Sequence, residues 1–116
     1  MVEILSQNVR GLGKEFKRRK IFNWLQKCSA SIIFLQETHS TENCEKTWRT
    51  EWGSKNVFFS HGESNARGVC ILCKPSVSME IHNQISDEFG RYVIVEATID
   101  STKIVLCNIY GPNNDD

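Results

Sequence analysis

Residues 31–40 read SIIFLQETHS, and the four apolar residues at positions 32–35 decide the fold class. A short continuous apolar run of this kind is typical of a strand that is covered on both faces. Upstream, apolar residues recur at helical spacing: Ile21, Trp24, Leu25 and Cys28. They predict a helix over residues 14–28, and a short strand is predicted before it over residues 2–8. The order strand–helix–strand favours two parallel strands joined by a right-handed crossover.

The remaining sequence is predicted to form one more helix and then only strands. The helix is expected over residues 42–51, and the strands over residues 57–60, 69–74, 77–81, 91–99 and 103–110. Together these segments predict an α/β fold: a mixed sheet of about six or seven strands with helices on one face. Strands 69–74 and 103–110 are apolar on both faces, yet no segment remains to cover the second face. We therefore expect an exposed apolar sheet face.

Length and composition indicate one globular domain. The 116 residues can bury a real core, and the 14 basic and 14 acidic residues cancel, so net charge indicates neither a nucleic-acid nor a membrane partner. No apolar stretch approaches the roughly 18 residues of a membrane span, and the start lacks the pattern of a secretory signal. Five cysteines, an odd number, suggest a reducing compartment. The chain is expected to be intracellular, nuclear or cytoplasmic, without a membrane partner.

Cys70 and Cys73 have the C-x-x-C spacing of a redox or zinc half-site. However, they lie within a predicted strand, where residues three apart point to opposite faces. No second pair of cysteine or histidine ligands completes such a site. We therefore expect both to be core residues, as free cysteines commonly are.

Several polar side chains follow the ends of predicted strands. Asn8 closes the first strand, Glu37 follows the apolar run at 32–35, and Tyr110 with Asn113 follows the last strand. In parallel α/β sheets, ligands bind beyond the carboxyl ends of the strands. A carboxylate with amide oxygens nearby suits Mg²⁺, which keeps places for water and phosphate oxygens. The alternative is local: Glu37 caps a turn, and the asparagines serve only turn chemistry.

Basic residues gather between the first strand and the first helix: Arg10, Lys14, Lys17, Arg18, Arg19 and Lys20. Such a cluster can lie along a phosphate backbone, and Arg10, Lys14, Lys17 and Arg18 are the predicted nucleic-acid contacts. The alternative is a solvated helix face. Among the histidines, His39 lies two residues after Glu37 and is placed to be a general base, although a surface role is the alternative.

Four motifs follow one another in the chain: ILSQNVRGLG, IIFLQETHS, ARGV and NIYGPN. In this order and spacing they resemble the exonuclease–endonuclease–phosphatase superfamily, and above all the apurinic-type endonuclease domain of non-LTR retrotransposon polyproteins. The resemblance spans residues 3–113. It implies a four-layer α/β sandwich, in which two mixed sheets pack face to face between helices. It also implies enzymes that cleave phosphate esters with a divalent metal, Mg²⁺ or Mn²⁺.

The resemblance also implies roles for the residues at the strand ends. Glu37 matches the metal-binding glutamate, and Asn8 matches the asparagine that helps to organise metal and phosphate. Tyr110 matches the tyrosine beside the scissile phosphate, and Asn113 the asparagine of the same N-x-Y-x-P-N loop. In such enzymes the metal neutralises charge on the phosphate and leaving oxygen while an activated water attacks in line. DNA is the implied partner.

Two motifs of the family have no counterpart in residues 1–116. One is D-x-N, which positions nucleophile and phosphate, and the other is S-D-H, whose His–Asp pair does acid–base work. Asp115 and Asp116 lie too close behind Asn113 to replace the missing aspartate. The chain therefore resembles the N-terminal half of a truncated domain, and we expect weak Mg²⁺ binding and negligible activity from it alone. A homodimer, or a partner carrying the missing half, is expected to cover the exposed sheet.

Three functions remain open from the sequence. The first is a DNA endonuclease of the retrotransposon type. The second is a non-catalytic remnant or binding module that uses the basic cluster and the exposed sheet face. The third, hydrolysis of phosphomonoesters or phospholipids, is compatible with the same fold.

Overall fold

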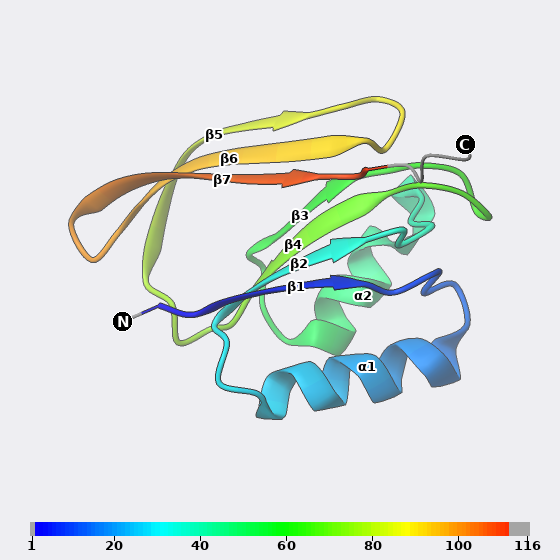
Figure 1. The fold of residues 1–116 in the computed structure, drawn as a ribbon. Helices are drawn as coiled ribbons and strands as arrows, with labels where there is room; N and C mark the ends of the chain where they lie inside the picture. The colour runs from blue at the N-terminus through cyan, green and yellow to red at the C-terminus, as the bar shows by residue number, and fades with distance from the viewer. Residues whose placement is uncertain (1, 112–116) are drawn as a thin grey trace.

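The computed structural model describes residues 2–111 and arranges them in three layers (Figure 1). Helices α1 (Glu15–Lys27) and α2 (Glu45–Trp52) form the first layer, with the short 3₁₀ helix η1 (Glu42–Cys44) leading into α2. The helices cover one face of a four-stranded sheet, and a three-stranded sheet covers the other face. The α/β class and the helices on one face of a mixed sheet are thus confirmed.

The middle layer contains the strand–helix–strand unit predicted at the start of the chain. Its strand order is β1-β2-β4-β3: β1 (Ile4–Asn8), β2 (Ile32–Gln36), β4 (Val69–Cys73) and β3 (Val57–Ser60). Strands β1 and β2 are parallel, with Asn8 opposite Gln36, and the other neighbours are antiparallel. All residues of β3 and β4 are buried, because both faces of this sheet are covered.

The strands form two sheets rather than one. This corrects the expected exposed face for the strand at residues 69–74, whereas on the strand at residues 103–110 the side chains of Val105 and Ile109 are exposed as expected. The second sheet is antiparallel with order β5-β6-β7: β5 (Met79–Ser86), β6 (Tyr92–Ile99) and β7 (Thr102–Ile109). Every second residue of β6 from Val93 to Ile99 is buried in a core shared with Ile71 and Cys73 of β4. The chain therefore covers the second face of the first sheet with its own strands, since period-2 alternation gives β6 an apolar side.

The face that helix α1 buries overlaps only in part with the one that its apolar spacing predicted. Arg18, Phe22 and Leu25 are its buried residues and Ile21 packs against the same core, whereas the Trp24 side chain is 57% exposed. The buried residues are spaced four and three apart, so they form one stripe on the helix. The prediction missed the rest of this stripe because one of its positions holds a charged residue, which the apolar spacing does not register. On α2 the buried residues are Trp48 and Trp52.

The two central cysteines point to opposite faces of β4, as their strand spacing predicted. Cys70 lies in the core between the sheet and the helices, and Cys73 lies in the core between the two sheets. Both are free thiols, and burial raises the pKa of Cys73 to about 12 and that of Cys70 further still. Neither is therefore a thiolate available for metal or redox chemistry.

Within residues 2–111, neither α1 nor α2 combines the length and the apolar character that a membrane span requires.

Candidate active site

The carboxyl ends of β1, β2 and β7 lie at the same edge of the molecule (Figure 1). Asn8 is the last residue of β1, Glu37 comes directly after β2, and Tyr110 comes directly after β7. The first two meet because β1 and β2 are parallel neighbours. The structure thus places three of the four predicted site residues at one edge, and Asn113 lies outside the described residues.

Asn8 and Glu37 are in direct contact. The Asn8 amide Nδ2 donates a hydrogen bond to Glu37 Oε2, and the backbone N–H of Arg10 donates to Asn8 Oδ1 over 3.0 Å. The backbone of Glu37 has a left-handed φ of 54°, and its carbonyl oxygen accepts from Gly11 N–H over 2.6 Å. A left-handed non-glycine residue costs about 1–2 kcal/mol, so surrounding contacts must hold Glu37 in this conformation. The carboxylate is therefore oriented by its neighbours before any ligand arrives.

Tyr110 and Glu37 line the same hollow, which His39 also borders. The Tyr110 backbone N–H donates to the Arg91 carbonyl oxygen over 2.6 Å, which continues the sheet one residue beyond β7. Part of the Tyr110 side chain packs against the core between the sheets. The hollow therefore brings together a carboxylate and an imidazole from the loop after β2 and a phenol from the end of β7.

Asn108 is a site residue that the sequence analysis did not assign, although it is the first asparagine of NIYGPN. Its side chain is buried and joins the two sheets: Nδ2 donates to the carbonyl oxygens of Leu35 and Cys70 over 2.9 and 2.8 Å. Its Oδ1 accepts from Gln36 Nε2 over 2.9 Å. Asn108 thus fixes the end of β7, and with it Tyr110, against the end of β2 that carries Glu37. An asparagine inside an apolar strand was the available signal, because a buried amide requires partners.

Three of the predicted basic contacts lie beside this hollow. Arg10, Lys14 and Lys17 line a second hollow, which shares His39 with the first. Lys17 Nζ donates to the carbonyl oxygens of Val9 and Arg10 over 2.8 and 3.1 Å, and so it also shapes the loop after β1. All three side chains belong to exposed residues and can reach a phosphate.

The fourth predicted contact, Arg18, is contradicted by the structure. Arg18 is 5% exposed and forms a two-pronged ion pair with Glu51, at 2.6 and 2.9 Å. Its guanidinium also lies over the Trp48 ring and donates to the Leu12 carbonyl oxygen. All of its donors face protein groups because the side chain crosses from α1 to α2. Arg18 therefore links the helices and is not available to nucleic acid.

Two further arginines line the first hollow and were not singled out from the sequence: Arg67 and Arg91. Arg67 Nε donates to the Phe89 carbonyl oxygen over 2.9 Å. Arg91 pairs with Asp87 through two nitrogens, and these hydrogen bonds lower the pKa of Asp87 below its ordinary value. Basic groups therefore line the Glu37 hollow itself as well as the adjoining hollow of Arg10 and Lys14. Both arginines lie in turn sequences, ARG and GR, and such a sequence does not indicate where the arginine lies relative to Glu37.

Three glycines allow the loops around the site to cross: Gly62, Gly68 and Gly90, here called the glycine crossing. A Cβ on Gly90 would lie 2.6 Å from the Gly62 Cα, and one on Gly68 would lie 2.5 Å from Thr38 Oγ1. Gly68 and Gly90 also have left-handed φ of 90° and 78°. The loop after β2, the β3–β4 loop and the β5–β6 turn can meet at this distance only without side chains. Gly68, the glycine of the ARGV motif, is therefore explained by packing.

The donor set of the site fits a metal that is bound by few protein ligands. Within residues 2–111, no group of three or more histidine, cysteine, aspartate or glutamate side chains could enclose an ion. Glu37 nevertheless presents a carboxylate with one oxygen, Oε1, outside the Asn8 contact. Mg²⁺ commonly binds proteins through one or two carboxylates and takes water and phosphate oxygens as its other ligands. Glu37 fits such an ion, with Asn8 orienting the carboxylate.

Comparison with known proteins agrees with this fold. The profile of the Endonuclease/Exonuclease/phosphatase family matches residues 5–111. The Transposon TX1 uncharacterized 149 kDa protein of Xenopus laevis is 30% identical over 111 residues, which are 96% of the chain. Two solved structures have a similar fold: the AP endonuclease LMAP from Leishmania major (TM-score 0.66, 18% identity) and the APE2 catalytic domain from Xenopus laevis (TM-score 0.60, 21% identity).

The chain spans only part of each of these proteins. It covers 8% of the transposon protein, and 40% and 45% of the two solved structures. In the other direction, 94% and 95% of the chain is matched by the two structures. Essentially the whole chain is therefore equivalent to a part of each larger protein.

Proposed function

Since the chain belongs to the Endonuclease/Exonuclease/phosphatase family, we propose that it carries one half of a metal-dependent site that hydrolyses phosphodiester bonds in DNA. The observation that supports this most is the contact between Asn8 and Glu37 at the shared edge of β1 and β2. The backbone of Glu37 is left-handed, and its carboxylate is held by an asparagine rather than packed in the core. This carboxylate borders a hollow lined by basic residues. In our proposal this hollow receives the scissile phosphate.

Glu37 is the proposed ligand of Mg²⁺ or Mn²⁺, and Asn8 holds its carboxylate. A divalent ion bound there would stabilise negative charge on the phosphate and on the leaving oxygen. Asn8 Oδ1 is engaged by Arg10 N–H, so Asn8 acts on the metal through Glu37 in the described arrangement. Tyr110, which lines the same hollow as Glu37, is proposed to donate a hydrogen bond to a phosphate oxygen. We assign Asn113, in the same loop, to phosphate binding as well.

The basic side chains around the hollow support DNA as the substrate. Arg67 and Arg91 line the hollow of Glu37, and Arg10, Lys14 and Lys17 line the adjoining hollow that shares His39. A phosphate backbone that runs through both hollows would meet several cations. Each neutralised phosphate should add about one unit to the slope of the logarithm of the binding constant against the logarithm of salt concentration. A single phosphomonoester would occupy only one of the two hollows, which favours the endonuclease over a phosphatase.

Residues 1–116 by themselves are proposed to bind a metal weakly and to have negligible nuclease activity, as the truncated half of a domain. The sequence contains no D-x-N and no S-D-H motif, so groups that position and activate the water are missing. Positioned acid–base catalysis alone contributes about 10²–10⁴-fold to a rate. We further propose an intracellular, reducing setting, which is supported by the free thiols of all five cysteines in the described part of the chain.

The test is Mn²⁺ titration of the isotope-labelled chain, followed by paramagnetic broadening of its NMR signals. Broadening should begin at Asn8, Glu37 and Tyr110, and Glu37→Gln should abolish it. Glu42→Gln is the matched control, because Glu42 is an exposed glutamate on η1. Broadening that survives Glu37→Gln would refute the metal site.

A second measurement tests the substrate and the activity. Nicking of supercoiled plasmid in Mg²⁺ should equal the EDTA background for the chain alone, and the weak binding of a DNA duplex should fall in Lys14→Ala with a smaller salt dependence. Glu37-dependent nicking above background would contradict the proposed inactivity and would favour a site completed by a second copy. Loss of phosphate from a small monoester instead would favour the phosphatase.

The alternative function is a non-catalytic binding module. It is favoured by the outer face of the β5–β7 sheet, where the side chains of Val105 and Ile109 are 65% and 63% exposed and Ile85 is also exposed. A homodimer, or a partner chain, would then cover this outer face. It would not cover the face of β4, which the sequence analysis expected to be exposed and which is buried in the structure. Sedimentation velocity distinguishes the two readings: a dimer that Val105→Lys dissociates would favour the binding module, and a monomer would count against it.

A further inference from the structure

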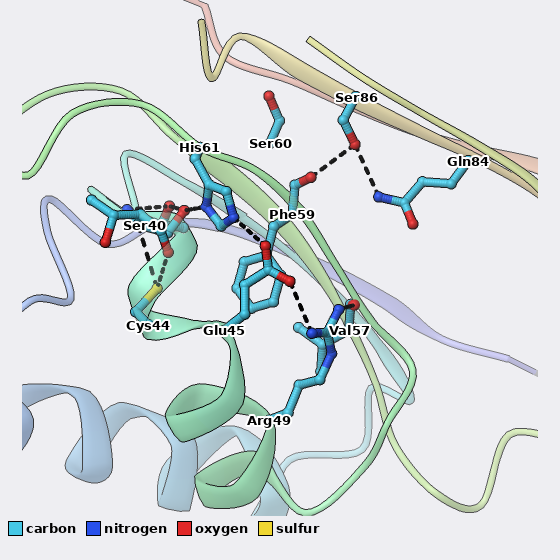
Figure 2. Close-up of polar contacts among 12 residues, drawn as sticks. Ser40, Cys44, Glu45, Arg49, Val57, Phe59, Ser60, His61, Gln84 and Ser86 are labelled. Carbon is cyan, nitrogen blue, oxygen red and sulfur yellow. Dashed lines mark hydrogen bonds and ion pairs between the residues drawn. The ribbon is translucent and has the colours of Figure 1, made fainter. Parts of the chain in front are cut away.

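Four side chains near the site form a continuous chain of hydrogen bonds, and Figure 2 shows its part from Ser40 through His61 to Glu45. Thr38 Oγ1 donates to Ser40 Oγ over 3.2 Å, and Ser40 Oγ lies 2.8 Å from His61 Nδ1. His61 Nε2 lies 2.5 Å from Glu45 Oε2. The chain joins the loop after β2, the residue after β3 and the first turn of α2. None of these four residues was given a role in the proposed function.

The chemistry of the groups gives this chain one direction. The Glu45 carboxylate can only accept, so His61 Nε2 must carry a proton and donate it. In the neutral ring Nδ1 is then the acceptor, and the Ser40 hydroxyl donates to it. Burial raises the pKa of Glu45, but hydrogen bonds from His61 and Arg49 outweigh this effect, so the pKa lies below its ordinary value. Glu45 is thus ionised and anchors the chain.

The other end of the chain reaches the segment that carries Glu37. Glu37 and His39 both have left-handed backbones, with φ of 54° and 58°, on either side of Thr38. Thr38 and Ser40 are completely buried, and Ser40 N–H donates to Thr38 Oγ1 over 3.3 Å. Two left-handed positions separated by one residue would relax without such constraints, because each costs about 1–2 kcal/mol. The hydroxyl of Thr38 is therefore the point where side-chain hydrogen bonds restrain this loop.

Backbone hydrogen bonds hold the same loop. Thr38 N–H donates to the Gly68 carbonyl oxygen over 3.0 Å, and His39 N–H donates to that of Arg67 over 2.8 Å. Both partners lie in the β3–β4 loop, whose backbone also has a left-handed φ at Arg67. The two loops are joined to strands β2 and β4, and the chain through His61 adds a side-chain connection from Thr38 to α2, because Glu45 lies on that helix.

We propose that Ser40, His61 and Glu45 form a positioning relay that holds Thr38 and thereby sets the orientation of the Glu37 carboxylate. The importance of that orientation rests on the proposed function, in which Glu37 binds the metal. Groups that orient a metal ligand typically change metal affinity about 10–100-fold when they are removed. The described residues that line the Glu37 hollow include none of the relay residues, so the relay acts only through the loop.

Two variants break the relay, and one should preserve its essential part. Ser40→Ala removes the central hydroxyl. His61→Phe removes both ring nitrogens but keeps the stacking on Phe59, whose ring centroid is 5.1 Å from that of His61. His61→Asn should retain an acceptor near the position of Nδ1 and so keep the bond from Ser40. His82→Phe is the matched control, because His82 is exposed on the outer sheet and hydrogen-bonds only Thr98 among the contacts that the structure describes for its side chain.

The first readout needs no metal and no activity. Long-range ¹H–¹⁵N spectra of the native chain should show the proton of His61 on Nε2. Strong intraresidue HN–Hα cross-peaks at Glu37 and His39 should report their left-handed backbones. These cross-peaks should weaken in Ser40→Ala and His61→Phe, and persist in His61→Asn and His82→Phe. Native signals from Val93 and Val95 in the other core verify that each variant is folded.

The second readout is the affinity for Mn²⁺ by calorimetry. Ser40→Ala and His61→Phe should weaken it about tenfold, and His61→Asn should restore most of it. The proposal is overturned if both variants keep the left-handed signals, if His61 carries its proton on Nδ1, or if the signals are lost while Mn²⁺ affinity is unchanged. Glu37→Gln is the separate test of the metal site itself: if Mn²⁺ binding does not depend on Glu37, the proposed function fails whatever the relay variants show.

Discussion

The connection between the two sheets through Asn108 can be tested by Asn108→Ala. The substitution removes three hydrogen bonds of 2.8–2.9 Å from a side chain that is 1% exposed. Each bond contributes about 1 kcal/mol net, and groups left buried without a partner add about 1–2 kcal/mol more. We therefore expect the free energy of unfolding to fall by about 3–5 kcal/mol. For a chain of this size the melting temperature should fall by about 12–20 °C.

The assay is urea unfolding followed by tryptophan fluorescence and by circular dichroism. The midpoint should shift by roughly 2 M for a slope of about 1–3 kcal/mol/M. Asn83→Ala is the matched control, because Asn83 is exposed on β5 and should change stability by less than about 0.5 kcal/mol. Asn108→Asp should be at least as damaging as alanine, since it directs a carboxylate at two carbonyl oxygens. A loss below about 1 kcal/mol for Asn108→Ala would refute the reasoning.

Three further predictions concern the loops, the helices and the acid limit of stability. Gly68→Ala should destabilise the chain by several kcal/mol, because the new Cβ would overlap Thr38 Oγ1 and φ is left-handed; thermal unfolding measures this. Arg18→Ala should lower the free energy of unfolding by about 3 kcal/mol, because it leaves Glu51, whose side chain is 12% exposed, without its ion pair. The double variant Arg18→Met, Glu51→Leu should lose less stability in urea unfolding. Stability should also fall as the pH drops below about 4. The Asp87 carboxyl has a lowered pKa in the folded chain, so it takes up its proton at a lower pH there than in the unfolded chain. Asp87→Asn should flatten this acid limb, measured as the urea midpoint against pH.

Local sequence patterns were sufficient for most elements of the middle layer. The apolar run at residues 32–35 and the strand at 57–60 lie where β2 and β3 are found. A strand that is buried on both faces appears in the sequence as a short continuous apolar run, which can be recognised locally. β5 was less accessible: a strand was predicted over residues 77–81, and β5 runs from Met79 to Ser86. Its second half is exposed and polar, with a register shift after Ile81, so no alternation marked it.

The assignment of strands to sheets required information that local patterns do not contain. An apolar strand shows that both its faces are covered, but it does not say by what. β4 was read as a strand that lacked a cover, and the cover proved to be β6 of the same chain. The division follows from tertiary packing, since β5, β6 and β7 pair only with one another.

The site divides in the same way. Asn8 and Glu37 could be placed together because the ends of parallel strands meet at one edge. Arg67 and Arg91 could not, since they reach the hollow from turns of unknown direction. Arg18 was misread because a charged helical residue is usually solvated, and its partner Glu51 lies 33 positions away.

The glycine crossing also bears on how the molecule could acquire a new target. The loop between β3 and β4 has a closed base, where Glu63 and Ala66 exchange backbone hydrogen bonds of 2.8 and 3.2 Å, and an exposed tip at Ser64 and Asn65. Ser64 borders one hollow of the site and Asn65 borders the other. Because the crossing admits no side chain, substitutions are tolerated at these two tip positions rather than at the glycines beneath them. Randomising the two positions would vary the groups that line the hollows beside Glu37 while the underlying backbone stays constant.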